Sequence, residues 1–348
     1  LGVVILTSGF SILGSTKQTL PIAVQTSEQD SKFEGLGHHT RKISTVSEAA
    51  QAHFNQALTW AFAFNHDEAI RSLMKATKED PTCPMAWWGI AYSEGPNYNS
   101  PITPERSKAA YYAMQNATSQ IGNANDVERA LIEALSNRYP FPAAADRKPL
   151  DQAYAAAMGK VWKAFPQDAD VGTLYAESLM MLRPWKLYTI DGEPVEDTDK
   201  IISTLESVLK LQPDHPGANH LYVHAMEPSQ TPEKALKAAH ALDDLVPASG
   251  HLLHMPSHIY VRTGLWNEAI EQNVKALDAD QKYLKLSPQQ GMQHIYMIHN
   301  SHMLAYAAMM SGREKEAMFA ARRMWEQTPD AILTSMGSFF DRWMCSVY

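Results

Sequence analysis

The stretch Ala235-Leu-Lys-Ala-Ala-His-Ala-Leu-Asp-Asp-Leu-Val-Pro247 decides the fold class of this chain. It begins with a small residue, ends with a proline, and places Leu or Ala every three or four positions in between. Apolar residues at that spacing form one face of an α-helix. The small side chain lets another helix approach closely, and the proline ends the helix. The stretch therefore predicts the second helix of a packed helix pair.

The same pattern recurs along the chain, which indicates an internal repeat. Ala235 and Ala269 are 34 residues apart, the length of a two-helix repeat unit. Longer gaps predict two insertions, one of about fourteen residues near 282–297 and one at 183–199. Further alanine–proline pairs with the same twelve-residue spacing as Ala235 and Pro247 are Ala69 with Pro81, and Ala317 with Pro329.

The composition fits a chain with a large folded core and excludes several classes of function. Of its 348 residues, 45% are hydrophobic and 20% are charged, as in ordinary globular proteins. The net charge of −8 argues against nucleic acid as a partner, because phosphate binding needs clustered Lys and Arg. Two cysteines are too few for a disulfide framework or a cysteine-rich zinc module.

Three short segments resemble the tetratricopeptide repeat family. They are Ala-Trp-Trp-Gly-Ile-Ala-Tyr at 86–92, Gly-Leu-Trp-Asn-Glu-Ala-Ile at 264–270 and Gly-Arg-Glu-Lys-Glu-Ala-Met at 312–318. The resemblance covers roughly residues 47–330. It implies an all-α fold, a right-handed superhelical solenoid of about seven helix pairs curved around a groove. Such repeats are commonly protein-binding scaffolds, so the resemblance implies no particular activity.

The chain accordingly divides into two parts. Residues 1–46 form an extended apolar N-terminal segment and linker, and residues 47–348 form the tetratricopeptide-like α-solenoid. Apolar helical periodicity, interrupted by Pro, Gly and Asn, starts at about residue 47 and continues from there.

Histidines occupy matching positions in successive repeats. Fourteen occur in the chain, and ten of them lie between residues 215 and 302. The family resemblance implies that the first helix of each pair lines the groove, so these histidines are expected to face it. Matching pairs are His220 with His254 and His224 with His258, each 34 residues apart, and His251 and His254 with His299 and His302, each 48 residues apart.

These matching histidines predict a transition-metal site. Residues four apart share a helix face, and neighbouring helices pack about 8–10 Å apart, so that histidines from two helices can reach one ion. Neutral imidazole is a common ligand for zinc, copper and iron, and the pattern does not distinguish these metals. The candidate ligands are His220, His224, His254, His258, His299 and His302, with His251, Glu177 and Glu227 as second choices.

Pro256 complicates the geometry of one histidine pair. It lies between His254 and His258, and proline disfavours a helix interior. A helix that begins near Pro256 would leave His254 on the incoming turn. The pair can still converge, but not simply because of helical spacing.

Two classes of function remain open. The first is a metal-binding repeat protein, as a metal-dependent hydrolase or an oxidoreductase, because an open coordination position could hold water or dioxygen. The second is a non-enzymatic scaffold that binds a peptide in the groove or self-assembles into an oligomer or filament. Metal-free catalysis by a histidine is disfavoured, because no nucleophile is paired with one in the sequence.

The N-terminal segment is the main candidate for self-assembly. Residues 1–14 are apolar and rich in β-branched side chains, but they are too few for a transmembrane helix. They also resemble part of a secretory signal, which predicts an extracellular or periplasmic location. We expect residues 1–24 to dock as a strand, on the same solenoid or on a neighbouring copy.

The sequence also suggests where several other side chains lie. The adjacent His38 and His39 could either cap the metal site or form an exposed turn. His215 and His240 fall outside the matching positions, which predicts surface residues. Trp185 is one of several tryptophans that we expect to lie mostly in the core.

Overall fold

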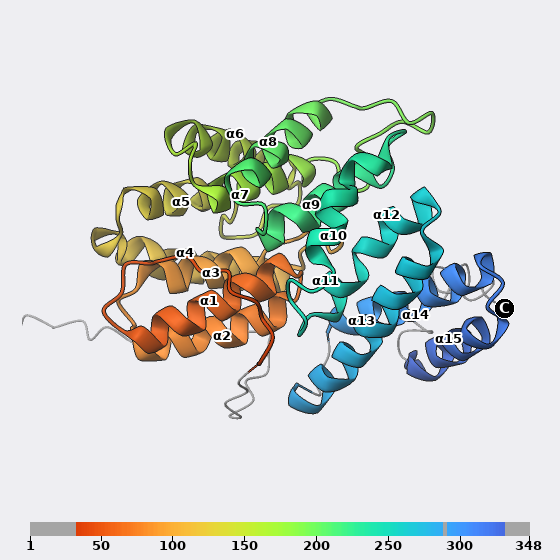
Figure 1. The fold of residues 1–348 in the computed structure, drawn as a ribbon. Helices are drawn as coiled ribbons and strands as arrows, with labels where there is room; N and C mark the ends of the chain where they lie inside the picture. The colour runs from red at the N-terminus through yellow and green to blue at the C-terminus, as the bar shows by residue number, and fades with distance from the viewer. Residues whose placement is uncertain (1–32, 288–290, 331–348) are drawn as a thin grey trace, which may run out of the picture.

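The computed structural model describes residues 33–287 and 291–330. In these ranges the chain is an all-α solenoid of tetratricopeptide-like helix pairs, as the sequence predicted (Figure 1). Short 3₁₀ turns at Ile121–Asn123 and Pro232–Ala235 join some of the helices. The pairs are α1 (Glu48–Phe62) with α2 (His66–Glu79), α3 (Pro84–Glu94) with α4 (Pro104–Ser119), α5 (Asp126–Ser136) with α6 (Lys148–Ala164), α7 (Ala169–Met180) with α8 (Thr198–Leu211), α9 (Pro216–Met226) with α10 (Leu236–Leu242), α11 (Gly250–His254) and α12 (Pro256–Thr263) with α13 (Trp266–Leu286), and α14 (Gln293–Met310) with α15 (Glu314–Gln327).

Capping residues explain where several helices begin. The side chain of Ser47 accepts a hydrogen bond from the backbone N–H of Ala50 at the start of α1. At α5, Asn125 and Glu128 form a reciprocal capping box. These contacts satisfy N–H groups that have no partner within the helix.

Small residues allow the helices to pack closely. The repeat alanines Ala69, Ala235 and Ala269 are completely buried. A Cβ atom added to Gly89 would lie 2.6 Å from a methyl carbon of Leu73 on the preceding helix. The close packing confirms the predicted role of small residues at these positions.

The solenoid curls far enough for its first and later repeats to meet. A Cβ atom at Gly217, at the start of α9, would lie 2.6 Å from the ring of Phe62 at the end of α1. Arg71 on α2 donates to the hydroxyl of Tyr283 on α13 at 3.3 Å. Figure 1 shows α1 and α2 beside the middle of the solenoid. The first repeat therefore packs against α9 and α13.

Three local features depart from the sequence interpretation or refine it. The stretch 251–263, which resembles one helix in sequence, is two short helices that meet at Met255, because Pro256 begins the second one. Part of the insertion near 282–297 lengthens α13, which runs to Leu286. The insertion at 183–199 is mostly a loop between α7 and α8.

The predicted docking strand, residues 1–24, lies outside the described residues. Among the helices that the structure describes, none is both long and apolar enough to cross a membrane.

Candidate metal centre

The matching histidines come together from the first helices of three consecutive pairs. His220 and His224 lie one turn apart on α9. His251 and His254 lie on α11, His258 lies on α12, and His299 lies on α14. In space they form two groups of three, His220–His224–His251 and His254–His258–His299. We refer to these as the first and second histidine groups.

The first histidine group joins α9 to α11. One ring nitrogen from each of its three histidines lies within 4.8 Å of the others. The Nε2 atoms of His220 and His251 are 3.1 Å apart. All three side chains are buried. The spacing is close to that needed for three imidazoles to bind one ion at about 2.0–2.1 Å each.

The second histidine group joins α11, α12 and α14. Its three ligand nitrogens also lie within 4.8 Å of one another. The Nε2 atoms of His254 and His258 are 2.9 Å apart. The chain remains helical on both sides of Met255, so Pro256 does not separate the two rings.

Glu227 connects the two histidine groups, because its carboxylate contacts one ring of each. One of its carboxylate oxygens lies 3.2 Å from Nδ1 of His224, and the other lies 2.6 Å from Nδ1 of His258. Burial alone would raise the pKa of Glu227, but the two histidines outweigh it and lower that pKa well below its ordinary value. Glu227 is therefore an ionised acceptor that orients one ring of each group, and the nitrogens that converge in both groups belong to imidazoles.

Acceptors outside the groups fix the tautomers of two further histidines. Nδ1 of His220 donates to the carbonyl oxygen of Phe62 at 2.7 Å. Nδ1 of His254 donates to Oδ1 of Asn273 at 2.8 Å. The amide of Asn273 is itself oriented, because its Nδ2 donates to the carbonyl of Ala269 at 2.7 Å. A ring that donates from Nδ1 in its neutral form carries a lone pair on Nε2.

The Nε2 lone pairs of His254 and His258 consequently face each other. His254 donates from Nδ1 to Asn273, and His258 donates from Nδ1 to Glu227. Their two Nε2 atoms, only 2.9 Å apart, are then both acceptors in the neutral state. Only a proton or a metal ion between them removes this repulsion.

Burial favours the neutral, metal-binding form of the cluster. Desolvation, reinforced by neighbouring histidines, holds the pKa values of His220, His251 and His254 well below the ordinary range. The same causes lower the pKa of His299. Burial and His258 lower the pKa of His302 to about 4. At neutral pH these rings therefore carry a lone pair that an ion can use.

Phe64 covers the cluster on the side of the first repeat. Its ring centroid lies 4.4 Å from that of His220, 5.9 Å from His224 and 6.0 Å from His251. Phe64 has a positive φ of 56°, a conformation that non-glycine residues rarely adopt. The turn between α1 and α2 thus places an apolar ring over the first histidine group.

Two of the sequence candidates lie apart from the histidine groups. Glu177 is buried on α7 and accepts a hydrogen bond from the hydroxyl of Tyr92, which uses its carboxylate away from the histidines. His302 lies beside His299, with ring centroids 5.9 Å apart, but none of its nitrogens is among the three that form the second group. His251, a second choice from the sequence, belongs to the first group instead.

A third constellation, which we call the clasp, ties the linker to the solenoid. Oδ1 of Asp170 accepts from Nε2 of His39 at 3.0 Å and from Nε2 of His215 at 3.1 Å. Oδ2 of Asp170 accepts from Arg41 at 2.9 Å. Nδ1 of His215 accepts from the backbone N–H of Ala218, so Nε2 of His215 carries the proton. In the clasp, the Nε2 nitrogens of both histidines therefore point at the carboxylate of Asp170.

The clasp corrects two sequence interpretations. His39 does not cap the histidine groups, because it is bound to Asp170. His215 is not a surface residue, since its ring is completely buried in the clasp. His240, by contrast, is exposed as predicted, and its side chain is 55% accessible.

A cavity of about 450 Å³ opens beside both histidine groups. Four of the six grouped histidines reach its wall, two from each group. Trp185, which was expected in the core, is 57% exposed and lies at this wall. The described lining residues are Asn99, Trp185, His224, His251, His258, Met292, Ile295, Tyr296 and His299.

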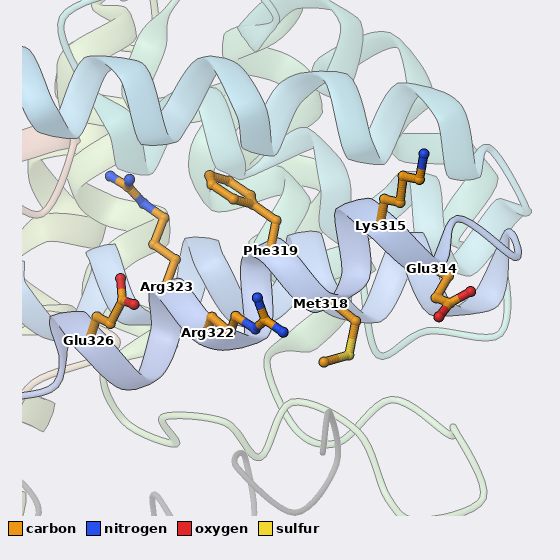
Figure 2. Close-up of a pocket in the computed structure, with 7 residues that line it drawn as sticks. All are labelled: Glu314, Lys315, Met318, Phe319, Arg322, Arg323 and Glu326. Carbon is orange, nitrogen blue, oxygen red and sulfur yellow. The ribbon is translucent and has the colours of Figure 1, made fainter.

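A larger depression elsewhere has a different character. It lies along α15, and Figure 2 shows its seven lining side chains, all from Glu314 to Glu326. None of these side chains is a histidine, so this depression offers no comparable ligand set.

Fold and site together define a tetratricopeptide-like solenoid with a buried histidine cluster. No protein-family model and no curated protein matches this chain. Among solved structures, MamA from Desulfovibrio magneticus RS-1 matches with a TM-score of 0.38 and 16% identity, over 52% of this chain and 87% of that chain. YrrB, described as a TPR protein with an unusual peptide-binding site, matches with a TM-score of 0.31 and 12% identity, over 72% of this chain and 90% of that chain.

A third similar structure is the human IFIT1 dimer with m7Gppp-AAAA. It matches with a TM-score of 0.37 and 16% identity, over 81% of this chain and 69% of that chain. Because all these scores are low, we transfer no property of these proteins to the chain.

Several residues of the site carry no signal in the sequence. Asn273 is one of many polar residues on a helix, and only the structure shows it bonded to His254. Phe64 reaches the cluster because the solenoid curls, which a local sequence pattern does not encode. The signal that could have implicated Trp185 is its place in an insertion, since insertions into repeats often carry function.

Proposed function

We propose that this protein binds two transition-metal ions, one in each histidine group, and uses them in catalysis. The observation that carries this proposal is the pair of Nε2 atoms of His254 and His258, 2.9 Å apart. Their Nδ1–H groups are committed to Asn273 and Glu227, so each Nε2 presents a lone pair. A proton or a metal ion between the two atoms would satisfy both lone pairs, and we favour the metal ion because a ring nitrogen of His299 completes a group of three within 4.8 Å of one another.

The surroundings of the ligands support the same proposal. Metal-binding histidines commonly donate their other ring nitrogen to a carboxylate or a carbonyl, which fixes the tautomer and orients the ring. Glu227 does this for His224 and His258, and the Phe62 carbonyl does it for His220. Both groups thus have a supporting shell as well as three ligands.

The ligand set favours copper or zinc over iron. Each group offers three imidazoles, whereas mononuclear non-haem iron oxygenases use two histidines and one carboxylate. Glu227, the nearby carboxylate, interacts with ring Nδ1 atoms. Hard oxygen-seeking ions such as magnesium and calcium are poor matches for an all-imidazole site.

An incomplete coordination shell and the adjacent cavity favour an enzyme over a structural metal site. Structural zinc sites are closed by four protein ligands, whereas catalytic sites keep a position open. Each group supplies three ligands, and histidines of both reach the cavity. Zinc would support hydrolysis by bound hydroxide, and copper would support oxidation. The element bound therefore decides between the hydrolase and the oxidoreductase.

Elemental analysis of the purified protein tests this proposal. We expect about two ions of zinc or copper per chain after loading and desalting. The double variant His220→Ala/His258→Ala removes one ligand from each group and should lose most of this metal. The control His38→Ala/His240→Ala removes two histidines outside the groups and should keep it. Less than one ion per several chains, or equal loss in both double variants, would refute the proposal.

A further inference from the structure

The walls of the cavity beside the histidine groups suggest what kind of molecule it holds. Trp185, Met292, Ile295 and Tyr296 supply aromatic and apolar surface. None of the described lining residues is Lys, Arg, Asp or Glu. Asn99 is the one amide among them, beside four histidines. Walls of this kind accept an apolar body that carries few polar atoms.

Trp185 is held at this wall by its backbone and by two aromatic contacts. Its φ of 61° lies in the left-handed region, where a bulky residue is strained. Its ring stacks on Tyr98 with centroids 5.1 Å apart, and its edge meets His224 at 5.6 Å. A large indole that stays more than half exposed in such a position is available to stack on another ring.

Tyr296 on α14 supplies a second aromatic side chain to the cavity wall. Its ring stacks on His251 with centroids 4.3 Å apart and an interplanar angle of 28°. Asn97 and Asn99 lie close to its hydroxyl. Aromatic side chains thus contact a histidine of the first group from two elements, the loop after α7 and helix α14.

We propose that the cavity binds a small aromatic substrate, whose single ligating atom reaches the histidine groups while its ring packs against Trp185. This inference rests on the proposed metal-binding function. The volume of about 450 Å³ falls in the range of small-molecule sites and leaves no room for an extended peptide across several repeats. The aromatic walls match a flat ring.

Calorimetric titration of the zinc-loaded protein tests the inference. Phenol serves as an aromatic probe with one ligating oxygen, and cyclohexanol serves as its non-aromatic counterpart with the same ligating oxygen. We expect phenol to bind about 3- to 10-fold more tightly than cyclohexanol, because only a flat aromatic ring can stack on Trp185. Trp185→Ala should weaken phenol binding about 3- to 10-fold, the value of one aromatic contact, without changing the zinc content.

Trp325→Ala is the matched control, because Trp325 is 56% exposed and Trp185 is 57% exposed. Trp325 lies on α15, away from the cavity lining, so its replacement should leave phenol binding unchanged. Normal zinc content without phenol binding, equal or tighter binding of cyclohexanol, or equal binding by Trp185→Ala would each overturn the inference alone. A wild-type protein that takes up no zinc or copper would instead overturn the proposed function, and this inference with it.

Discussion

The clasp and the second histidine group each bring together three potential metal ligands, but they differ in where the ring protons point. In the clasp, both histidines donate to Asp170, and Arg41 balances the carboxylate. In the second histidine group, His254 and His258 donate outward, so their remaining nitrogens face each other. Proximity alone therefore does not define a metal site. The hydrogen bonds around each ring decide which nitrogen is available.

The largest predicted effect is a loss of stability of the metal-free protein as the pH falls. Because burial lowers the pKa of His220, His251 and His254, the unfolded chain binds more protons than the folded one below about pH 6.5. The metal-free protein should lose stability as the pH falls through that value, by about 1.4 kcal/mol per pH unit for each histidine kept neutral. Denaturant unfolding at pH 7.5 and 5.5 measures this loss.

A variant of the first group isolates the contribution of one ring. His251→Phe keeps an aromatic ring against Tyr296 and removes one titrating group. As the pH falls, the free energy of unfolding of this variant should decrease less steeply than that of the wild type. The two slopes should differ by about 1.4 kcal/mol per pH unit. Equal slopes in both proteins would show that the cluster is not responsible for the acid sensitivity.

Breaking the clasp should destabilise the fold without removing metal. Asp170→Ala leaves Arg41 buried without this partner and removes the acceptor shared by His39 and His215. The loss should be about 3–5 kcal/mol, as for other broken buried ion pairs. Urea unfolding measures this loss, and elemental analysis should find the metal content of the folded variant unchanged.

A surface pair provides the control for the clasp. His38 and Asp214 are 2.8 Å apart, with side chains that are 76% and 48% accessible. Asp214→Ala should cost less than about 1 kcal/mol, because water screens exposed ion pairs. If Asp170→Ala proved no worse than Asp214→Ala, or if it lost its metal, the distinction between clasp and cluster would fail.

The smallest effect concerns an orienting residue of the second group. Asn273→Leu removes the acceptor that holds Nδ1 of His254. Metal affinity should drop about 10- to 100-fold, as for other outer-shell partners, while the ligands themselves remain. Competition with a chelator of known affinity measures the change.

Asn116→Leu controls for the loss of a helical asparagine. Asn116 also donates from Nδ2 to a backbone carbonyl four residues earlier, that of Tyr112. It is not one of the residues that contact the histidine groups, so its replacement should leave the affinity unchanged. An equal drop in both variants would place the effect of Asn273 in helix stability and not in the orientation of His254.

The repeat pattern predicted the helices well, because alanine and proline spacing acts locally. Ala235 and Ala269 are completely buried, and Pro256 begins a helix where the sequence suggested it could. The pattern also selected the six grouped histidines, although it ranked His251 below His302. It did not divide them into two groups, since that depends on how three successive pairs stack.

Long-range packing explains what the sequence missed. The curl of the solenoid brings Phe62 and Phe64 from the first pair onto α9, so the first histidine group is buried. His39 reaches Asp170 across 131 positions of the chain, and no local spacing predicts that contact. The exposed Trp185 at the cavity depends on a left-handed backbone conformation that is rare for its residue type.

Anomalous diffraction from crystals of the zinc- or copper-loaded protein would test the metal assignment most directly. We predict two strong peaks, one about 2.0–2.1 Å from nitrogens of His220, His224 and His251, and one at the same distance from nitrogens of His254, His258 and His299. The clasp should show none. A peak between His39, Asp170 and His215, or none at either histidine group, would contradict the assignment.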